Sequence, residues 1–147
     1  MKIALASDHA GYAEKERLKN VLADLGVDFE DLGTDSEASV DYPDYALKVA
    51  EQVARGRVDQ GLLVCGSGTG MAITANKVPG VRAAVAWSEE TARLARQHNN
   101  ANVLALGART TPPADIANIV RAWFVTEFEG GRHAERVEKI CEVERSY

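Results

Sequence analysis

The sequence predicts an α/β fold, a doubly wound five-stranded parallel sheet with helices on both of its faces. Two observations support this prediction. Short apolar runs alternate five times with amphipathic helical stretches, and no linker, repeat or low-complexity segment interrupts the 147 residues. A strand–helix unit repeated with short links gives right-handed crossovers and a parallel sheet. We therefore expect one domain over residues 1–147, with the strand order 2-1-3-4-5.

The first half of the chain supplies three strands and two helices. The predicted strands are apolar runs, and they cover Ile3–Ser7, Val27–Leu32 and Leu62–Cys65. A helix is predicted over Tyr12–Leu25, because its apolar residues recur on one face and Gly26 is typical of the position after a helix end. Pro43 favours the start of a second helix over Asp44–Arg55.

The second half continues the same alternation. Two further strands are predicted over Arg82–Trp87 and Val103–Leu106. The predicted helices cover Gly70–Asn76, Ser88–Gln97, Pro112–Glu127 and Arg132–Arg145. Ser88 can cap its helix, and Glu90 is favourable at the positive end of the helix dipole. The pair Gly130 and Gly131 separates the last two helices.

The composition indicates an ordinary globular protein. Hydrophobic residues make up 46% of the chain, and the net charge of −5 comes from acidic and basic residues mixed along it. A protein that binds duplex nucleic acid normally presents a basic face, so we expect no such partner. No apolar run approaches the roughly 18 residues that cross a bilayer, and Asp8 comes too early for a secretory signal. We expect a cytoplasmic protein in which the widely separated Cys65 and Cys141 stay reduced and bind no zinc.

The segment with the most chemical content is Gly61–Gly70, in which an apolar strand ends in Cys65 and three glycines follow at alternate positions. Glycine adopts left-handed backbone conformations freely, so this turn can direct consecutive N–H groups at one point. Such a turn binds an anion or a developing oxyanion. Cys65 is therefore a candidate nucleophile or base. The alternative is a tight strand-to-helix turn with a buried, inert cysteine.

Three phosphate-binding motifs fail to match this turn at Met71. A dinucleotide fingerprint requires glycine there, a P-loop requires lysine, and a cysteine phosphatase loop requires arginine. The turn is therefore not one of these three motifs.

Asp8 and His9 follow the first predicted strand, and the glycine turn follows the third. Rossmann-like and flavodoxin-like sheets bind ligands beyond the C-terminal ends of their strands, at the point where the strand order reverses. Strands one and three are neighbours in the expected order, so these two motifs should converge. The alternative is that Asp8 caps the following helix and His9 is a surface residue.

Two arginines open the last predicted helix. Arg132 and Arg136 are four residues apart and share a helical face. Cations oppose the dipole at a helix N-terminus, so a bound phosphate explains them better than a solvated face paired with Glu129 or Glu135.

The three histidines, His9, His98 and His133, all fall at junctions between predicted elements. His98 follows the fourth helix, at the N-terminal edge of the sheet and away from the glycine turn. As a catalytic residue it would serve the site of a neighbouring subunit. The alternative is a helix C-cap.

These residues belong to segments that together resemble the ribose-5-phosphate isomerase B family, which includes the galactose-6-phosphate isomerase subunits. The resemblance covers nearly the whole chain. The matching segments are Ala-Ser-Asp-His-Ala-Gly, Asp41-Tyr42-Pro43, Cys-Gly-Ser-Gly-Thr-Gly, Ala75-Asn76-Lys77, Arg96-Gln97-His98-Asn99 and Glu-Gly-Gly-Arg-His-Ala-Glu-Arg.

The resemblance implies an aldose–ketose isomerase that interconverts D-ribose 5-phosphate and D-ribulose 5-phosphate through an enediolate, without metal or organic cofactor. Cys65 resembles the base, His98 the ring-opening acid/base, and Ser67 a group that orients the thiol or shuttles a proton. The implied anion hole comprises Gly66, Ser67, Gly68, Thr69 and Gly70. The implied ligands are Asp8, Tyr42 and Asn99 for the sugar hydroxyls, and His9, Arg109, Arg132 and Arg136 for the phosphate. Some relatives lack the cysteine and use a glutamate at the position that is Met71 here. A methionine cannot accept a proton, so Cys65 has no competing base at that position.

Two alternatives remain open from the sequence. One is a six-carbon sugar-phosphate isomerase, acting on galactose or allose 6-phosphate. The other is a non-catalytic sugar-phosphate sensor. For an isomerase of either a five-carbon or a six-carbon sugar phosphate, the position of His98 leads us to expect a homodimer, or a tetramer, whose active sites are shared between subunits.

Overall fold

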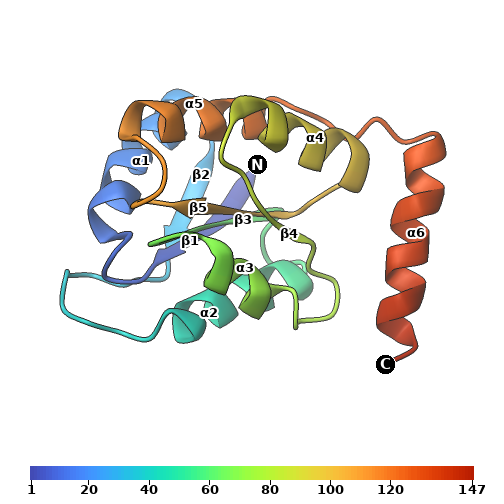
Figure 1. The fold of residues 1–147 in the computed structure, drawn as a ribbon, viewed down its shortest axis with the longest axis horizontal. Helices are drawn as coiled ribbons and strands as arrows, with labels where there is room; N and C mark the ends of the chain where they lie inside the picture. The colour runs from blue at the N-terminus through green and yellow to red at the C-terminus, as the bar shows by residue number, and fades with distance from the viewer.

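The computed structural model describes residues 1–147 and contains five strands and six helices (Figure 1). The strands are β1 (Lys2–Ser7), β2 (Asp28–Asp31), β3 (Gln60–Cys65), β4 (Ala83–Val85) and β5 (Val103–Gly107). The helices are α1 (Tyr12–Asp24), α2 (Tyr42–Ala54), α3 (Thr69–Ala75), α4 (Glu89–Asn99), α5 (Pro113–Phe124) and α6 (Arg132–Arg145). All strand pairs are parallel, which confirms the predicted fold class.

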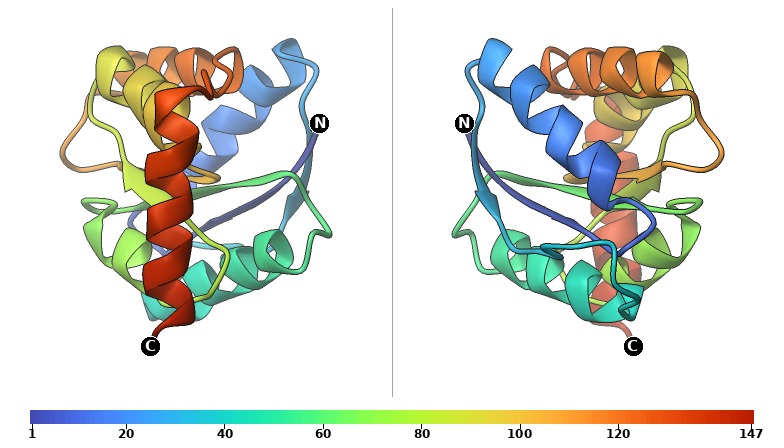
Figure 2. Two further views of the ribbon diagram at one scale, coloured as in Figure 1. Left: turned by 90° about the vertical axis from the view of Figure 1, so that its right-hand side faces the viewer. Right: turned by 90° about the vertical axis from the view of Figure 1, so that its left-hand side faces the viewer.

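The sheet separates two apolar cores. Helices α1, α4 and α5 cover one face, and α2 and α3 cover the other (Figure 1). The first core contains Leu18 of α1 and Ile116 of α5, and the second contains Val49 of α2 and Met71 of α3. Met71 is therefore a core residue. The last helix, α6, stands at the side of the molecule, where it packs mainly against α4 (Figures 1 and 2).

The strand order is β2-β1-β3-β5-β4, so the predicted order of the last two strands was wrong. Strand β5 pairs with β3 through Gly61 and Val103, and β4 lies outside it at the edge. The difference in burial between β4 and β5 explains why β5, and not β4, lies next to β3. All five residues of β5 are buried, as suits an interior strand, whereas β4 has only three residues and is half-buried. Chain order alone did not carry this information.

Several boundaries differ from the predicted ones by a few residues. Strand β3 begins at Gln60, because this side chain is buried and accepts a hydrogen bond from Nε1 of Trp123 at 2.6 Å. Helix α2 begins at Tyr42, ahead of Pro43, which occupies its first turn. No helix has the length and apolarity that a membrane span requires.

Neighbouring strands β1, β3 and β5 end at the same edge of the sheet, which brings together the residues that follow them. Gly11 makes this edge compact, because a side chain there would collide with the carbonyl of Val64. Helix α1 can therefore begin directly against β3. The predicted convergence of Asp8 with the glycine turn is thereby confirmed.

Candidate active site

A cavity of about 450 Å³ lies at the C-terminal edge of the sheet. Its lining residues come from the ends of β1, β3 and β5 and from the start of α2 and α3. They are Asp8, Tyr42, Cys65, Gly66, Ser67, Gly70, Arg109 and Thr110. The sequence singled out all of these except Thr110, whose only signal was its place next to Arg109.

Cys65 is 5% exposed, yet its side chain borders the cavity. Its Sγ accepts the backbone N–H of Gly68 at 3.1 Å. Gly68 has a φ of +80°, and a Cβ there would lie 3.0 Å from the backbone of Leu106, so the turn requires glycine. The sulfur therefore borders the cavity while a backbone donor of the glycine turn fixes its position.

The rest of the glycine turn retains free donors. Thr69 donates its N–H to Oγ of Ser67 at 3.3 Å, so this hydroxyl lies at the start of α3. The N–H groups of Gly66 and Ser67 donate to no acceptor in the chain. Two adjacent unpaired amides beside a thiol can stabilise an oxyanion that forms in the cavity.

Arg109 supplies positive charge to this cavity. Its N–H donates to the carbonyl of Gly66 at 2.9 Å, which ties the end of β5 to the glycine turn. A Cβ built on Gly66 would lie 3.6 Å from Nη1 of Arg109, so the guanidinium lies against the turn. Arg109 takes part in no ion pair with a carboxylate. Its fork of donors is therefore available to a phosphate.

Asp8 is 6% exposed and held from two sides. Its N–H donates to the carbonyl of Val64 at 3.2 Å, and its Oδ1 accepts the N–H of Gly11 at 3.0 Å. The adjacent His9 accepts the N–H of Val40 at Nδ1, at 3.1 Å. A neutral His9 therefore carries its proton on Nε2, which can donate to an anion.

Five other residues singled out by the sequence, outside the glycine turn, do not line the cavity: His9, His98, Asn99, Arg132 and Arg136. His98 and Asn99 end α4, and the two arginines are exposed at the start of α6. His98 was predicted to lie at the N-terminal edge of the sheet, and it does, because α4 ends shortly before the start of β5. Gly68 and Thr69 belong to the turn without lining the cavity.

His98 stacks on the buried His133, with ring centroids 4.1 Å apart and planes 10° from parallel. Its Nε2 lies 3.6 Å from Oε1 of Glu129. Burial, the neighbouring His98 and Arg132 hold the pKa of His133 below its usual value. The ligand atoms of His98, Glu129 and His133 lie within 4.8 Å of one another. However, parallel rings direct their nitrogen lone pairs side by side, so this arrangement is a stack and not a metal chelate.

Comparison with known proteins gives one consistent result. The family model described as ribose/galactose isomerase matches residues 3–140. The chain is 46% identical to the ribose-5-phosphate isomerase B of Escherichia coli over 144 residues, 98% of this chain and 97% of that protein. Among solved structures, the ribose-5-phosphate isomerase B of Clostridium thermocellum is 50% identical and superposes with a TM-score of 0.97 over 100% of this chain and 99% of that one. The Mycoplasma genitalium enzyme with bound ribulose-5-phosphate is 42% identical, with a TM-score of 0.95 over 99% and 97% of the two chains.

Proposed function

This chain belongs to the ribose/galactose isomerase family. We propose that it interconverts D-ribose 5-phosphate and D-ribulose 5-phosphate, and that Cys65 is the base. The observation that carries this assignment is the position of the Cys65 sulfur. It borders a cavity that also holds the guanidinium of Arg109, and it accepts a backbone N–H from Gly68.

The chemistry needs a base, an acid and stabilisation of developing negative charge. The Cys65 thiolate removes the proton from C2 of the open-chain aldose, the C2–H electron pair forms a C1–C2 double bond, and O1 becomes an oxyanion. The free N–H groups of Gly66 and Ser67 stabilise that oxyanion. The proton on O2 then passes to O1, and the thiol returns its proton to C1 to give the ketose. Atoms and electrons balance within the sugar.

Substrate binding is divided between the two ends of the sugar phosphate. Asp8 and Tyr42 line the cavity beside Cys65 and bind sugar hydroxyls. Arg109 and the Nε2 of His9 bind the phosphate. Holding the phosphate fixes the reacting carbons against the sulfur, which replaces an encounter in solution by an intramolecular step.

A second copy of the chain completes the site. Within one chain, the ring-opening residue His98, the hydroxyl ligand Asn99 and the phosphate ligands Arg132 and Arg136 all lie away from the cavity. Helix α6, which carries the arginines, exposes Ile140 by 44% and Val143 by 61%. Both line a groove between α6 and β4, so an apolar surface continues from the helix to the sheet edge. These features support a homodimer in which each cavity receives residues from its partner.

The reaction is tested by replacing the sulfur and following the carbon-bound proton. Purified Cys65→Ala protein should lose turnover of ribose 5-phosphate while it still binds the sugar phosphate. In deuterated water, the wild-type protein should introduce deuterium at C2 of ribose 5-phosphate, and Cys65→Ala should not. A sensor without catalytic activity would leave C2 unlabelled in both proteins. Near wild-type turnover by Cys65→Ala would remove the assigned base.

Two further points remain proposals. A six-carbon substrate, galactose or allose 6-phosphate, differs by one hydroxymethyl group, and a comparison of kcat/KM for five- and six-carbon substrates decides between them.

A cysteine base must be reduced, and neither Cys65 nor Cys141 forms a disulfide, which supports the cytoplasm as the working compartment.

A further inference from the structure

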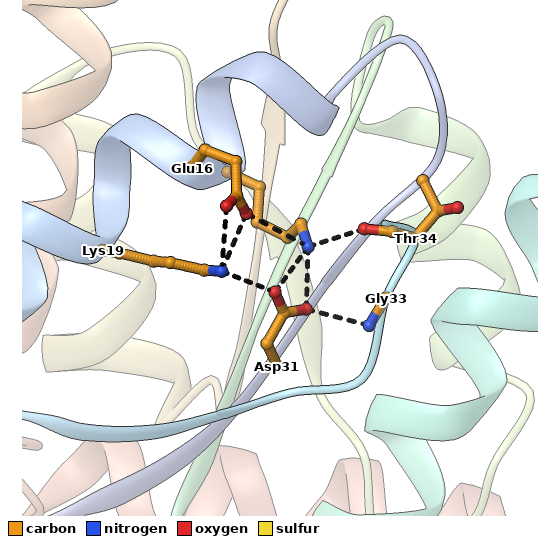
Figure 3. A network of polar contacts seen from close by, with 6 residues as sticks. Glu16, Lys19, Asp31, Gly33 and Thr34 are labelled. Carbon is orange, nitrogen blue, oxygen red and sulfur yellow. Dashed lines mark hydrogen bonds and ion pairs between the residues drawn. The ribbon is translucent and has the colours of Figure 1, made fainter. Parts of the chain in front are cut away.

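An ammonium group is buried where α1 meets the end of β2. Lys15, on α1, is 0% exposed. Its Nζ donates to both oxygens of Asp31 and to the carbonyl of Thr34, each at 2.7 Å. Asp31 also pairs with Lys19 at 2.8 Å and accepts the N–H of Gly33 at 2.9 Å. Figure 3 shows the carboxylate of Asp31 turned toward the helix that carries Lys19, with the nitrogen of Gly33 facing that carboxylate.

Stability alone does not explain a lysine at this position. Removing an ammonium from water has a high desolvation penalty, and an apolar side chain of similar volume often stabilises a core equally well. What the ammonium provides, and an apolar side chain cannot, is a directed bond to the carbonyl of Thr34. The function of Lys15 should therefore be sought in what Thr34 holds.

Thr34 connects Lys15 to the end of β1. The N–H of Thr34 donates to the carbonyl of Ser7 at 2.8 Å, and the N–H of Ser7 donates to the carbonyl of Gly33 at 2.7 Å. The next residue is Asp8, whose side chain borders the cavity. Lys15 and Ser7 thus both bind Thr34, Lys15 at its carbonyl and Ser7 at its N–H.

The segment that starts at this turn also reaches the cavity at its other end. Beyond Thr34 the chain is bound again where Val40 donates its N–H to His9 at 3.1 Å. Two residues later comes Tyr42, which borders the cavity. Lys15 therefore anchors the first part of a segment that is bonded beside one lining residue, Asp8, and ends at another, Tyr42.

We propose that Lys15 is a positioning residue of the isomerase site, which holds the segment 31–42 against the end of β1 so that Asp8 and Tyr42 face Cys65. The inference rests on the proposed function, because Asp8 and Tyr42 are its sugar-hydroxyl ligands. Lys15 itself touches no reacting atom. It acts on substrate binding, not on the thiol.

The test compares two lysines that share Asp31 as a partner. Lys15→Met removes the bond to Thr34, whereas Lys19→Met removes an ion pair with Asp31 and leaves Thr34 bound. We expect Lys15→Met to raise KM for ribose 5-phosphate about tenfold, the equivalent of one hydrogen bond to a charged group, with a much smaller change in kcat. Lys19→Met should keep both constants near wild type. Thermal unfolding of each variant verifies that the assays are run on folded protein.

A double-mutant cycle separates positioning from a general loss of structure. In an Asp8→Asn background, where one of the two hydroxyl ligands is already impaired, Lys15→Met should raise KM by less than it does in the wild type, because only the position of Tyr42 is left to lose. If Lys15→Met does not fold, Asp31→Asn replaces it, with an increase in KM of about threefold expected from the weakened anchor. Wild-type KM in the folded Lys15→Met or Asp31→Asn protein, or a full effect in the Asp8→Asn background, would overturn the inference.

Cys65→Ala is assayed in parallel. Loss of activity in Cys65→Ala together with unchanged KM in Lys15→Met refutes the positioning role alone. Retained activity in Cys65→Ala instead refutes the proposed function.

Discussion

The ring of Tyr42 lies directly against the α-carbon of Gly70, so that a Cβ at position 70 would come within 2.5 Å of the ring. The two residues belong to the first turns of α2 and α3, and both line the cavity. Gly70 is therefore required for the close approach of Tyr42 and not for an unusual backbone conformation. This contact connects the packing of two helices to the shape of the cavity.

Gly70→Ala is expected to impair catalysis more than folding. The added methyl group must displace the Tyr42 ring, and a displacement of about 1 Å at a binding site reduces kcat/KM roughly tenfold to a hundredfold. Steady-state kinetics with ribose 5-phosphate and thermal unfolding measure the two effects. In a Tyr42→Ala background the substitution should have little further effect. A full additional loss there would show that another contact is responsible.

Arg109→Met is expected to weaken phosphate binding without destabilising the fold, because the guanidinium forms no ion pair within the chain. The loss of charge-assisted hydrogen bonds should raise KM about tenfold to a hundredfold. Inorganic phosphate should become a weaker competitive inhibitor by a similar factor. An unchanged inhibition constant would remove Arg109 from the phosphate site. Arg121, at the C-terminal end of α5, provides the control position.

Subunit mixing tests the proposal that each active site is shared between two subunits. Cys65→Ala and His98→Ala homodimers should both be inactive. A mixed dimer contains one cavity with both an intact Cys65 and an intact His98, so an equal mixture should recover about a quarter of the wild-type activity. The measurement is the rate of isomerisation before and after subunit exchange, which a size or mass label verifies. Verified exchange with no recovery would place His98 and Cys65 of the same chain in one site.

The ion pairs of Asp31 predict a pH dependence of stability. Burial by itself would raise the pKa of this carboxyl, but hydrogen bonds from Lys15, Lys19 and Gly33 outweigh burial and hold the pKa below 3.8. As the pH falls, the Asp31 carboxyl therefore binds a proton in the unfolded chain at a higher pH than it does in the folded protein. The contribution of Asp31 to the free energy of unfolding is fully present above its unfolded pKa of 3.8, and it is lost as the pH falls through the lower folded value.

Urea unfolding of the wild type and Asp31→Asn at pH 7, 5 and 3 measures this contribution. The difference between the two proteins should be constant between pH 7 and 5 and should shrink at pH 3. A difference that stays constant, or grows, down to pH 3 would contradict the lowered pKa.

The types of the secondary structure elements could be predicted because apolar periodicity is local. The alternation of strands and helices, the glycine turn after Cys65 and the helix after Gly131 all follow from residues close together in the chain. The convergence of Asp8 with Cys65 was predictable from a general property of parallel sheets, since their ligands lie beyond the C-terminal ends of the strands.

Other features needed the folded chain. Lys15 gave no sequence signal, because a lysine on an amphipathic helix is an ordinary surface pattern. The only signal for Thr110 was its place next to Arg109, which is too weak to single out a threonine. The order of β4 and β5 was predicted wrongly, because it depends on which strand can be covered on both faces. That in turn depends on helices far away in the sequence.

By itself, then, the amino-acid sequence determined which segments become strands and helices and which side chains bring chemistry to the edge of the sheet. Only the tertiary structure decided which strand lies at the edge, that Cys65 borders a cavity, and that the ammonium of Lys15 is buried against Thr34. The physical reason is that periodicity and turn preferences act over a few neighbouring residues. Burial and hydrogen-bond partners are set by contacts between residues that are distant in the chain.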